Sequence, residues 1–168
     1  MTLSQFFSIT PFSWDAIGTA VACGSIVGIE RQLRGKPVGI RTSALITLGT
    51  YLFIAAAATL NSSNTDPSRV IGQVITGIGF LGAGVMLTRD GIVLGVTSAA
   101  TIWALASIGV VIAMDHLFTA VKLSLIVVAV LVGVDLLEDY SEAFTKGVHR
   151  KISKWRRRNG RTTTIDGP

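Results

Sequence analysis

The polar segment at residues 30–36, Glu-Arg-Gln-Leu-Arg-Gly-Lys, holds the side chains best suited to chemistry, and it lies between two long apolar stretches. A carboxylate where an apolar helix meets water either forms an ion pair or binds a cation or a proton. If the first helix continues to Glu30, its dipole disfavours a negative charge there, so Glu30 needs a partner. One interpretation is an interfacial ion pair with Arg41 or a neighbouring arginine. The other is a cation- or proton-sensing group at the mouth of a helix bundle.

Further polar side chains lie within the apolar stretches. Gln73 is the strongly polar member of the third stretch, and the fourth carries three hydroxyls close together. Polar groups inside a membrane protein mark ion pathways or hydrogen bonds between helices. The complete set of candidate functional or ion-sensing residues is Glu30, Arg31, Gln32, Arg41, Thr42, Gln73, Thr97, Ser98 and Thr101.

The sequence carries no recognisable catalytic or metal-binding pattern. His116 and His149 are isolated, Cys23 has no partner for a disulfide, and no His, Cys, Asp or Glu cluster has metal-ligand spacing. The glycines at 77, 79 and 82 match G-x-G-x-x-G, but they lie in an apolar stretch and lack the Lys-Ser/Thr of a phosphate loop. We expect no enzyme, no metal site and no cofactor, while Mg²⁺ as a bound or transported ion stays open.

The composition predicts a membrane protein. Hydrophobic residues make up 49% of the chain and charged residues only 15%, whereas a soluble domain carries about 25% charged residues. A membrane-spanning helix needs about 20 mainly apolar residues. Five stretches qualify, at residues 12–29, 42–60, 70–87, 92–113 and 117–134. The expected fold class is therefore all-α, a polytopic membrane protein with five transmembrane helices.

The positive charges predict the orientation of these spans. With five spans, every Lys and Arg except Arg69 and Lys122 falls on one side of the membrane. Because cytoplasmic segments are enriched in Lys and Arg, we expect a bacterial inner-membrane protein with its N-terminus outside and its C-terminus in the cytoplasm. The first 14 residues contain no Lys or Arg, so no signal peptide is expected. Basic residues beside spans indicate lipid headgroups as their partner and not nucleic acid.

The C-terminal segment has a different pattern. An apolar residue recurs every three or four positions from Tyr140 to Trp155, and Lys and Arg fill the other faces from Lys146 onward. This pattern predicts a basic amphipathic helix on the cytoplasmic membrane surface. The predicted organisation is a transmembrane domain at 1–137, the interfacial helix at 138–158 and a disordered tail at 159–168.

Small residues recur at helical spacing in three of the predicted spans. Such residues let helices approach closely in lipid. A second interpretation of the third span is a loosened helix whose free carbonyl groups bind an ion. The predicted packing residues are Gly24, Gly28, Gly77, Gly79, Gly82, Ala83, Gly84, Gly95 and Ala99.

Four blocks of sequence together resemble the MgtC/SapB family of bacterial inner-membrane proteins. They are Gly-Ile-Glu-Arg-Gln at 28–32, Gly-Ile-Arg-Thr at 39–42, the glycine-rich run at 77–84, and Gly95 with Thr-Ser-Ala-Ala-Thr-Ile-Trp at 97–103. The resemblance covers about residues 14–137, the transmembrane domain alone. Better-known virulence members have Asn and Cys where this chain has Thr97 and Ala104, and they carry a soluble C-terminal domain.

The resemblance implies a role in magnesium limitation, acid stress and survival inside host cells. It also implies contacts with other membrane proteins, including the proton-translocating ATP synthase, and it places the family's important acidic residue at Glu30. Our first hypothesis is a non-enzymatic regulatory or stress-adaptation protein that acts through membrane-protein partners, with a homo-oligomer also open. The alternative is a transporter or channel for magnesium or another cation that uses Glu30 and the glycine-rich third span.

Overall fold

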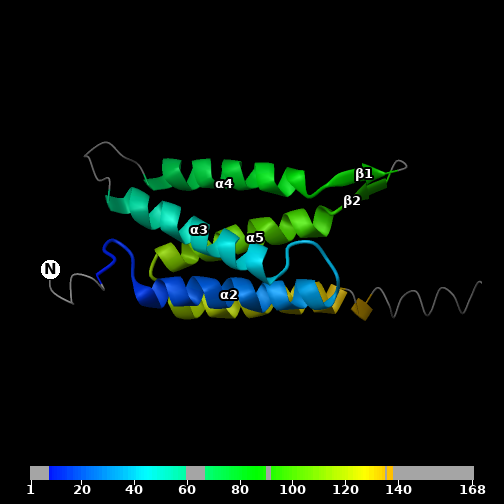
Figure 1. The fold of residues 1–168 in the computed structure, drawn as a ribbon, viewed down its shortest axis with the longest axis horizontal. Coiled ribbons are helices and arrows are strands. Elements are labelled where there is room, and N and C mark those ends of the chain that lie inside the picture. Colours follow the sequence, from blue (N-terminus) through cyan, green and yellow to red (C-terminus); the bar gives the residue numbers. More distant parts are fainter. Residues whose placement is uncertain (1–7, 60–66, 90–91, 135, 138–168) are drawn as a thin grey trace, which may run out of the picture. The chain divides into compact units, whose positions relative to one another are not determined.

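The computed structural model describes residues 8–59, 67–89, 92–134 and 136–137. In chain order its elements are α2 (Trp14–Leu33), α3 (Ile40–Thr59), α4 (Pro67–Gly84), β1 (Leu87–Arg89), β2 (Ile92–Leu94), α5 (Val96–Ala113) and a last helix at Leu117–Val134 (Figure 1). The described chain is therefore helical apart from one short β-hairpin. A first compact unit ends at Ala129, within the last helix.

The α2–α3 pair is held together by glycines. A Cβ atom built on Gly24 would lie 2.6 Å from Ala44 Cα, and one on Gly28 would lie 2.5 Å from Ile40 Cα. These distances leave no room for any side chain, so the two backbones are in direct contact. At the opposite end of the pair, the Ser13 backbone N–H donates to the Tyr51 hydroxyl over 3.0 Å.

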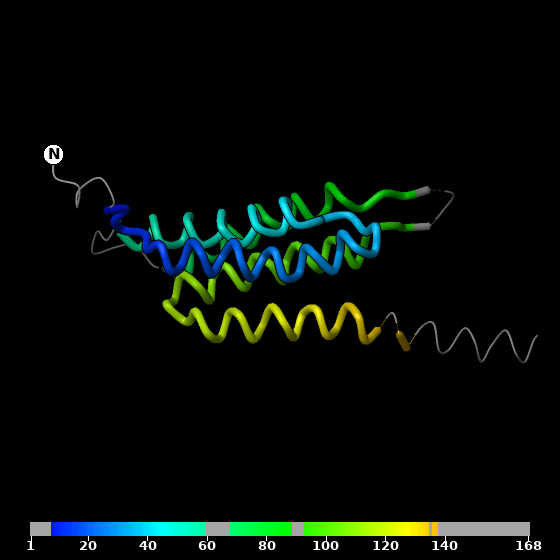
Figure 2. The backbone as a smooth tube through the Cα atoms, turned by 60° about the horizontal axis from the view of Figure 1, so that its bottom comes forward, coloured from blue at the N-terminus to red at the C-terminus, as the bar shows by residue number. Residues whose placement is uncertain are grey.

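The core lies between α2, α3, α5 and the start of the last helix. Its buried residues are Ala16, Ala20, Cys23, Tyr51, Ile108, Ile112 and Ala120. A Cβ on Gly109 of α5 would lie 2.6 Å from the Thr47 carbonyl oxygen of α3, so this contact is also one of backbone against backbone. The chain then reverses after α5, and the last helix runs back antiparallel to it (Figure 2).

Helix α4 lies at the outer edge of the bundle and is the least buried helix of the first unit (Figure 1). Among residues 68–84 only Gly82 is buried, and a Cβ added there would lie 3.7 Å from Ala99 Cβ of α5. The side chains of Phe80 and Leu81 are 82% and 50% exposed. Most of this helix therefore faces lipid, solvent or another molecule.

The fourth predicted span begins too early. Residues 92–94 form strand β2, which pairs antiparallel with β1 through the pairs Leu87–Leu94, Thr88–Val93 and Arg89–Ile92. Helix α5 starts only at Val96, after Gly95 takes φ +88°. A Cβ there would overlap the Val85 carbonyl oxygen, so both conformation and space favour glycine at this position. Periodicity cannot separate a short apolar strand from the first turn of a helix.

The other predicted spans agree with helices whose ends differ by a few residues. The last one, 117–134, has the predicted bounds, whereas α2 begins two residues later than predicted and continues to Leu33. Three helices are long and apolar enough to cross a membrane among the described residues: α3, α5 and Leu117–Val134. The predicted interfacial helix at 138–158 and the tail at 159–168 lie outside the described residues.

The α2–α3 contact predicts a selective effect of one methyl group. Gly28→Ala should lower the free energy of unfolding by about 1–3 kcal/mol, because the new Cβ meets the backbone of Ile40 and not a flexible side chain. Thermal unfolding of the purified protein in detergent measures this change. Gly18→Ala is the matched control, since nothing lies within 4 Å of a Cβ at Gly18 of the same helix. Equal unfolding temperatures for the two variants would contradict the prediction.

Candidate functional site

The candidate site is a buried charge cluster in the last turn of α2. The helix does not stop at the first charged residue: the Arg34 N–H donates to the Glu30 carbonyl over 3.2 Å, and the Lys36 N–H donates to the Arg31 carbonyl over 2.9 Å. Gly35 then takes φ +63°, the left-handed conformation that commonly ends a helix. Glu30 and Arg31 are therefore held on a regular helix, on the side that packs into the bundle.

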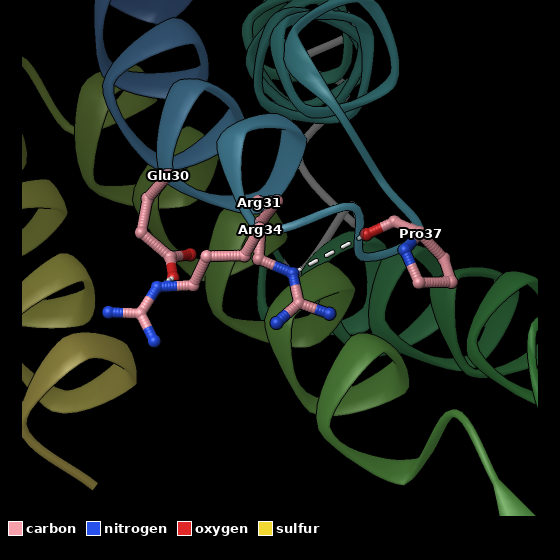
Figure 3. A network of polar contacts seen from close by, with 4 residues as sticks. All are labelled: Glu30, Arg31, Arg34 and Pro37. Atoms are coloured by element: carbon pink, nitrogen blue, oxygen red, sulfur yellow. Dashed lines mark hydrogen bonds and ion pairs between the residues drawn. The ribbon is translucent and has the colours of Figure 1, made fainter. Parts of the chain in front are cut away.

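Glu30 is an almost fully buried carboxylate, with 8% of the residue exposed. Arg34 Nε lies 2.8 Å from Glu30 Oε1, one helical turn away (Figure 3). Neither carboxylate oxygen receives a hydrogen bond of good geometry, so the Arg34 contact is an ion pair without a directed N–H. The expected ion pair therefore forms with Arg34 and not with Arg41. The two oxygens keep unused capacity to accept hydrogen bonds.

Arg31 is more deeply buried than Glu30, with 3% of the residue exposed. Its Nη2 donates to Ser98 Oγ over 2.6 Å. Its Nε donates to the Pro37 carbonyl over 3.4 Å, as Figure 3 shows. A charge removed from water is tolerated when hydrogen bonds and opposite charge replace the lost hydration. This single side chain thereby joins the end of α2, the α2–α3 connection and the first turn of α5.

Gln32 has a structural contact in the same region. Its Oε1 accepts a hydrogen bond over 3.3 Å from the N–H of Ile40, the first residue of α3. The first N–H groups of a helix have no partner within the helix, so this amide supplies one of them. Nearby, the Ser43 hydroxyl donates to the carbonyl of Val38 over 3.0 Å. The connection between α2 and α3 is thus held by side chains from both helices.

The remaining candidate residues do not join this cluster. Arg41, Thr42 and Thr97 are exposed. Thr101 is buried, and its hydroxyl donates to the Thr97 carbonyl within α5 over 2.8 Å. Of the three hydroxyls expected to form one patch, only that of Ser98 reaches the charge cluster.

Gln73 and Thr42 line a second feature, which we name the α3–α4 groove. It is a hollow of about 570 Å³ between these two helices. Its lining residues are Thr42, Leu45, Ile46, Gly49, Thr50, Phe53, Gln73, Val74, Gly77, Ile78 and Leu81. A smaller hollow of about 240 Å³ lies between α4 and α5, and Val74 and Ile78 line both hollows.

The small residues of the third predicted span differ in their contacts from the glycines of the first span. Nothing lies within 4 Å of a Cβ at Gly77, Gly79 or Gly84, and Ala83 is exposed. These positions therefore make no close helix contact within the described chain. Sequence reasoning missed Gly109 and Pro37. A glycine in the middle of an apolar span was the available signal for Gly109, whereas Pro37 contributes a backbone carbonyl that no side-chain pattern reveals.

The charge cluster holds a buried carboxylate through its ion pair with Arg34. No group of three or more His, Cys, Asp or Glu side chains is close enough to hold a metal ion within the described ranges. The Arg34 guanidinium is paired with Glu30, whereas the Arg31 guanidinium is directed to Pro37 and Ser98. By themselves, these residues therefore form a polar link that joins the end of α2 to α5.

Comparison with known proteins places the same region in a family. The family model for MgtC matches residues 17–140. YhiD of Escherichia coli K12, named as a candidate magnesium transporter, is 48% identical over 100 residues, which cover 55% of this chain and 46% of YhiD. An uncharacterised protein of Haemophilus influenzae is 38% identical over 146 residues, covering 82% of this chain and 58% of its own length.

Protein MgtC of Salmonella typhimurium is 38% identical over 108 residues, covering 64% of this chain and 46% of MgtC. The chain thus spans about half the length of the curated relatives it matches. No solved structure matches it.

The Arg31–Ser98 contact predicts a penalty for removing one hydroxyl. Ser98→Ala leaves a buried guanidinium without that acceptor, which should lower the free energy of unfolding by about 1–3 kcal/mol. Chemical or thermal unfolding in detergent measures the change. Thr97→Ala, which removes an exposed hydroxyl from the neighbouring position, should change stability by less than about 0.5 kcal/mol. A larger loss for Thr97→Ala than for Ser98→Ala would show that Arg31 does not depend on Ser98.

Proposed function

The chain belongs to the MgtC family, and from that premise we propose that it is a non-enzymatic regulatory or stress-adaptation protein of the bacterial inner membrane. In this proposal it serves cells under magnesium limitation or acid stress and acts by contacting other membrane proteins. One partner of this kind is the proton-translocating ATP synthase, which the resemblance to the family suggests.

The observation that carries the proposal is the outward face of α4. Gly72, Thr76, Gly79 and Ala83 recur at helical spacing and are all exposed, and nothing lies within 4 Å of a Cβ at either glycine. The Thr76 hydroxyl donates to the Gly72 carbonyl over 2.9 Å, so this side chain adds no unpaired hydrogen-bond donor to the face. A smooth face of this kind permits close approach of another helix in lipid, where packing and not hydrophobicity drives association.

We further propose that all five helices cross the membrane, with the N-terminus outside and the C-terminus in the cytoplasm. The helices α2 to α5 are 18 or 20 residues long, which is enough for the hydrocarbon core. Arg34 and Lys36, which follow the last turn of α2, are exposed and in this arrangement meet water or lipid headgroups. Short basic connections favour the cytoplasmic side.

Partner contact through α4 is tested by crosslinking in cells followed by purification. Gly79→Leu should lower the yield of crosslinked membrane protein at least about tenfold, because a branched side chain on the smooth face prevents close approach. Gly18→Leu, on exposed space of α2, should leave the yield unchanged. Both variants should remain folded, which size-exclusion chromatography verifies. If wild-type protein yields no crosslinked partner under magnesium limitation or at acid pH, the proposal fails.

A cation transporter is the second candidate, and Glu30 favours it. The two oxygens of this buried carboxylate receive no directed hydrogen bond and keep the capacity to accept one, and ionisable residues within membrane segments commonly mark ion pathways. YhiD, named as a candidate magnesium transporter, is similar over 55% of this chain.

Ion transport is tested with purified protein in liposomes. Under this second candidate function, Glu30→Gln should abolish uptake of Mg²⁺ or protons, because the amide keeps the size of the side chain and removes its charge. A dye inside the liposomes reports the flux. Empty liposomes and Thr97→Ala, which changes an exposed hydroxyl, are the controls. Flux that is the same in wild type and Glu30→Gln would exclude Glu30 from transport, and absence of flux from folded wild type would exclude the function.

A further inference from the structure

The β1–β2 hairpin has little support from the helices of the first unit. Each strand has three residues, and among the described residues each has a hydrogen-bonded neighbour on one side only. The hairpin is closely packed at its base, where Gly95 lies against the Val85 carbonyl group. A two-stranded hairpin by itself is marginally stable in water and needs a further surface to pack on. Something beyond this base contact must therefore support the strands.

The side chains of the hairpin are apolar and exposed. Leu87, Val93 and Leu94 each expose more than half of their surface, and so does Val96 directly after the strands. Leu87 pairs with Leu94 across the two strands, so these leucines share one face, while Val93 belongs to the other face. Apolar groups gathered in this way mark a surface that contacts a membrane or another protein.

The backbone of the hairpin adds a second requirement. In the part of the chain that the structure describes, no further strand pairs with the outer edges of β1 and β2. Open sheet edges do not occur in the hydrocarbon core of a bilayer, because their N–H and C=O groups find no partner there. The side chains therefore favour an apolar environment, while the backbone needs water or polar groups nearby. The boundary between hydrocarbon and headgroups provides both.

The place of the hairpin in the chain fits this boundary. Helix α4 has 18 residues, which is about 27 Å along a helix axis and close to the hydrocarbon thickness of about 30 Å. Strand β1 begins three residues after α4 ends, and Figure 1 shows the hairpin at that end of the helix. If α4 crosses the membrane, the hairpin is therefore at the membrane surface.

Exposed basic residues lie at the same end of the bundle. The hydrogen bond from Arg31 to Ser98 places the end of α2 beside the first turn of α5, which follows β2. Lys36, in the connection after α2, and Arg41, in the first turn of α3, are both exposed. Positive charge beside a membrane span attracts anionic phospholipid headgroups. This charge favours lipid over another protein as the surface that supports the hairpin.

We propose that the β1–β2 hairpin is an interfacial anchor that binds an anionic phospholipid surface. Leu87, Val93 and Leu94 lie among the outermost parts of the acyl chains, and the open strand edges form hydrogen bonds with water and headgroups. Lys36 and Arg41 bind the headgroup phosphates. The inference rests on the proposed membrane-spanning arrangement of α4, but not on the contact of α4 with protein partners.

The test uses the full chain with Cys23→Ala as the background, at one copy per nanodisc of phosphatidylethanolamine and phosphatidylglycerol. A nitroxide label is attached in turn to Leu94→Cys, to Ile75→Cys in α4 and to His116→Cys in the turn after α5, all at exposed positions. Electron paramagnetic resonance measures collisions of the label with oxygen, which concentrates in hydrocarbon, and with a water-soluble nickel chelate. The Leu94→Cys label should meet nickel at least about threefold less often than the His116→Cys label.

The label at Ile75→Cys separates this proposal from the arrangement on which it rests. If that label is in hydrocarbon while the label at Leu94→Cys meets nickel as often as the one at His116→Cys, α4 crosses the membrane but the hairpin is in water. A Leu94→Cys label shielded from both oxygen and nickel would show that protein covers the hairpin. Either result overturns the anchor, and nickel access at Ile75→Cys would overturn the membrane-spanning arrangement as well.

Matched variants test the part of the basic residues. Exchange of phosphatidylglycerol for phosphatidylcholine should raise nickel collisions of the Leu94→Cys label at least about twofold. Lys36→Gln combined with Arg41→Gln should cause the same rise in anionic nanodiscs, whereas Lys122→Gln, at an exposed basic position of the last helix, should not. Collisions that are indifferent to lipid charge, or equal effects of the two sets of variants, would overturn headgroup binding. Size-exclusion chromatography and thermal unfolding verify that each variant is folded.

Discussion

The burial of the Arg31 guanidinium is the constraint on which the arrangement of the first unit depends. A cation that is 3% exposed must find acceptors within the protein, and Arg31 finds them on Pro37 and Ser98. Ser98 is in the first turn of α5, far from Arg31 in the sequence, so this contact sets where α5 begins relative to the end of α2. Glu30 and Arg34 form an ion pair on the same turn, and the carboxylate offsets part of the positive charge.

The same constraint explains why glycines and hydroxyls are placed as they are. For Arg31 to reach Ser98, α2, α3 and α5 must approach closely, and Gly24, Gly28 and Gly109 allow this through backbone contact. Hydroxyl groups within the bundle are mostly satisfied by carbonyls of their own helix, as Thr47 and Thr101 show. Thr50 is the exception among these threonines, and it lies on the wall of the α3–α4 groove.

Helix α4 differs from the helices of the core in how its glycines are used. Gly82 lies against α5, but Gly77 borders a hollow towards α3 and Gly79 lies on a smooth outward face. The charge cluster at the end of α2 and the open surfaces of α4 are thus separate features of the same helix bundle. A bundle with one firmly packed set of helices and one lightly packed helix suits a protein that presents surfaces to other molecules in the membrane.

The sequence by itself determined the local features of this protein. Long uncharged stretches predict helices because only a helix pairs all of its backbone groups within one segment in lipid, and the blocks around Glu30 and Gly77 indicate the family. Span ends were less predictable, since apolar residues 92–94 suit a strand and a helix equally well. The partner of Glu30 was narrowed to nearby arginines but not to Arg34.

Only the tertiary structure decided which polar residues meet and which glycines carry close contacts. Ser98 joins Arg31 while Thr97 does not, and Gly28 touches a backbone while Gly77 borders a hollow. The physical reason is that helical periodicity specifies which residues share a face, whereas contacts depend on which helix that face meets and how closely. That distance is set by packing of the whole bundle, and no local pattern contains it.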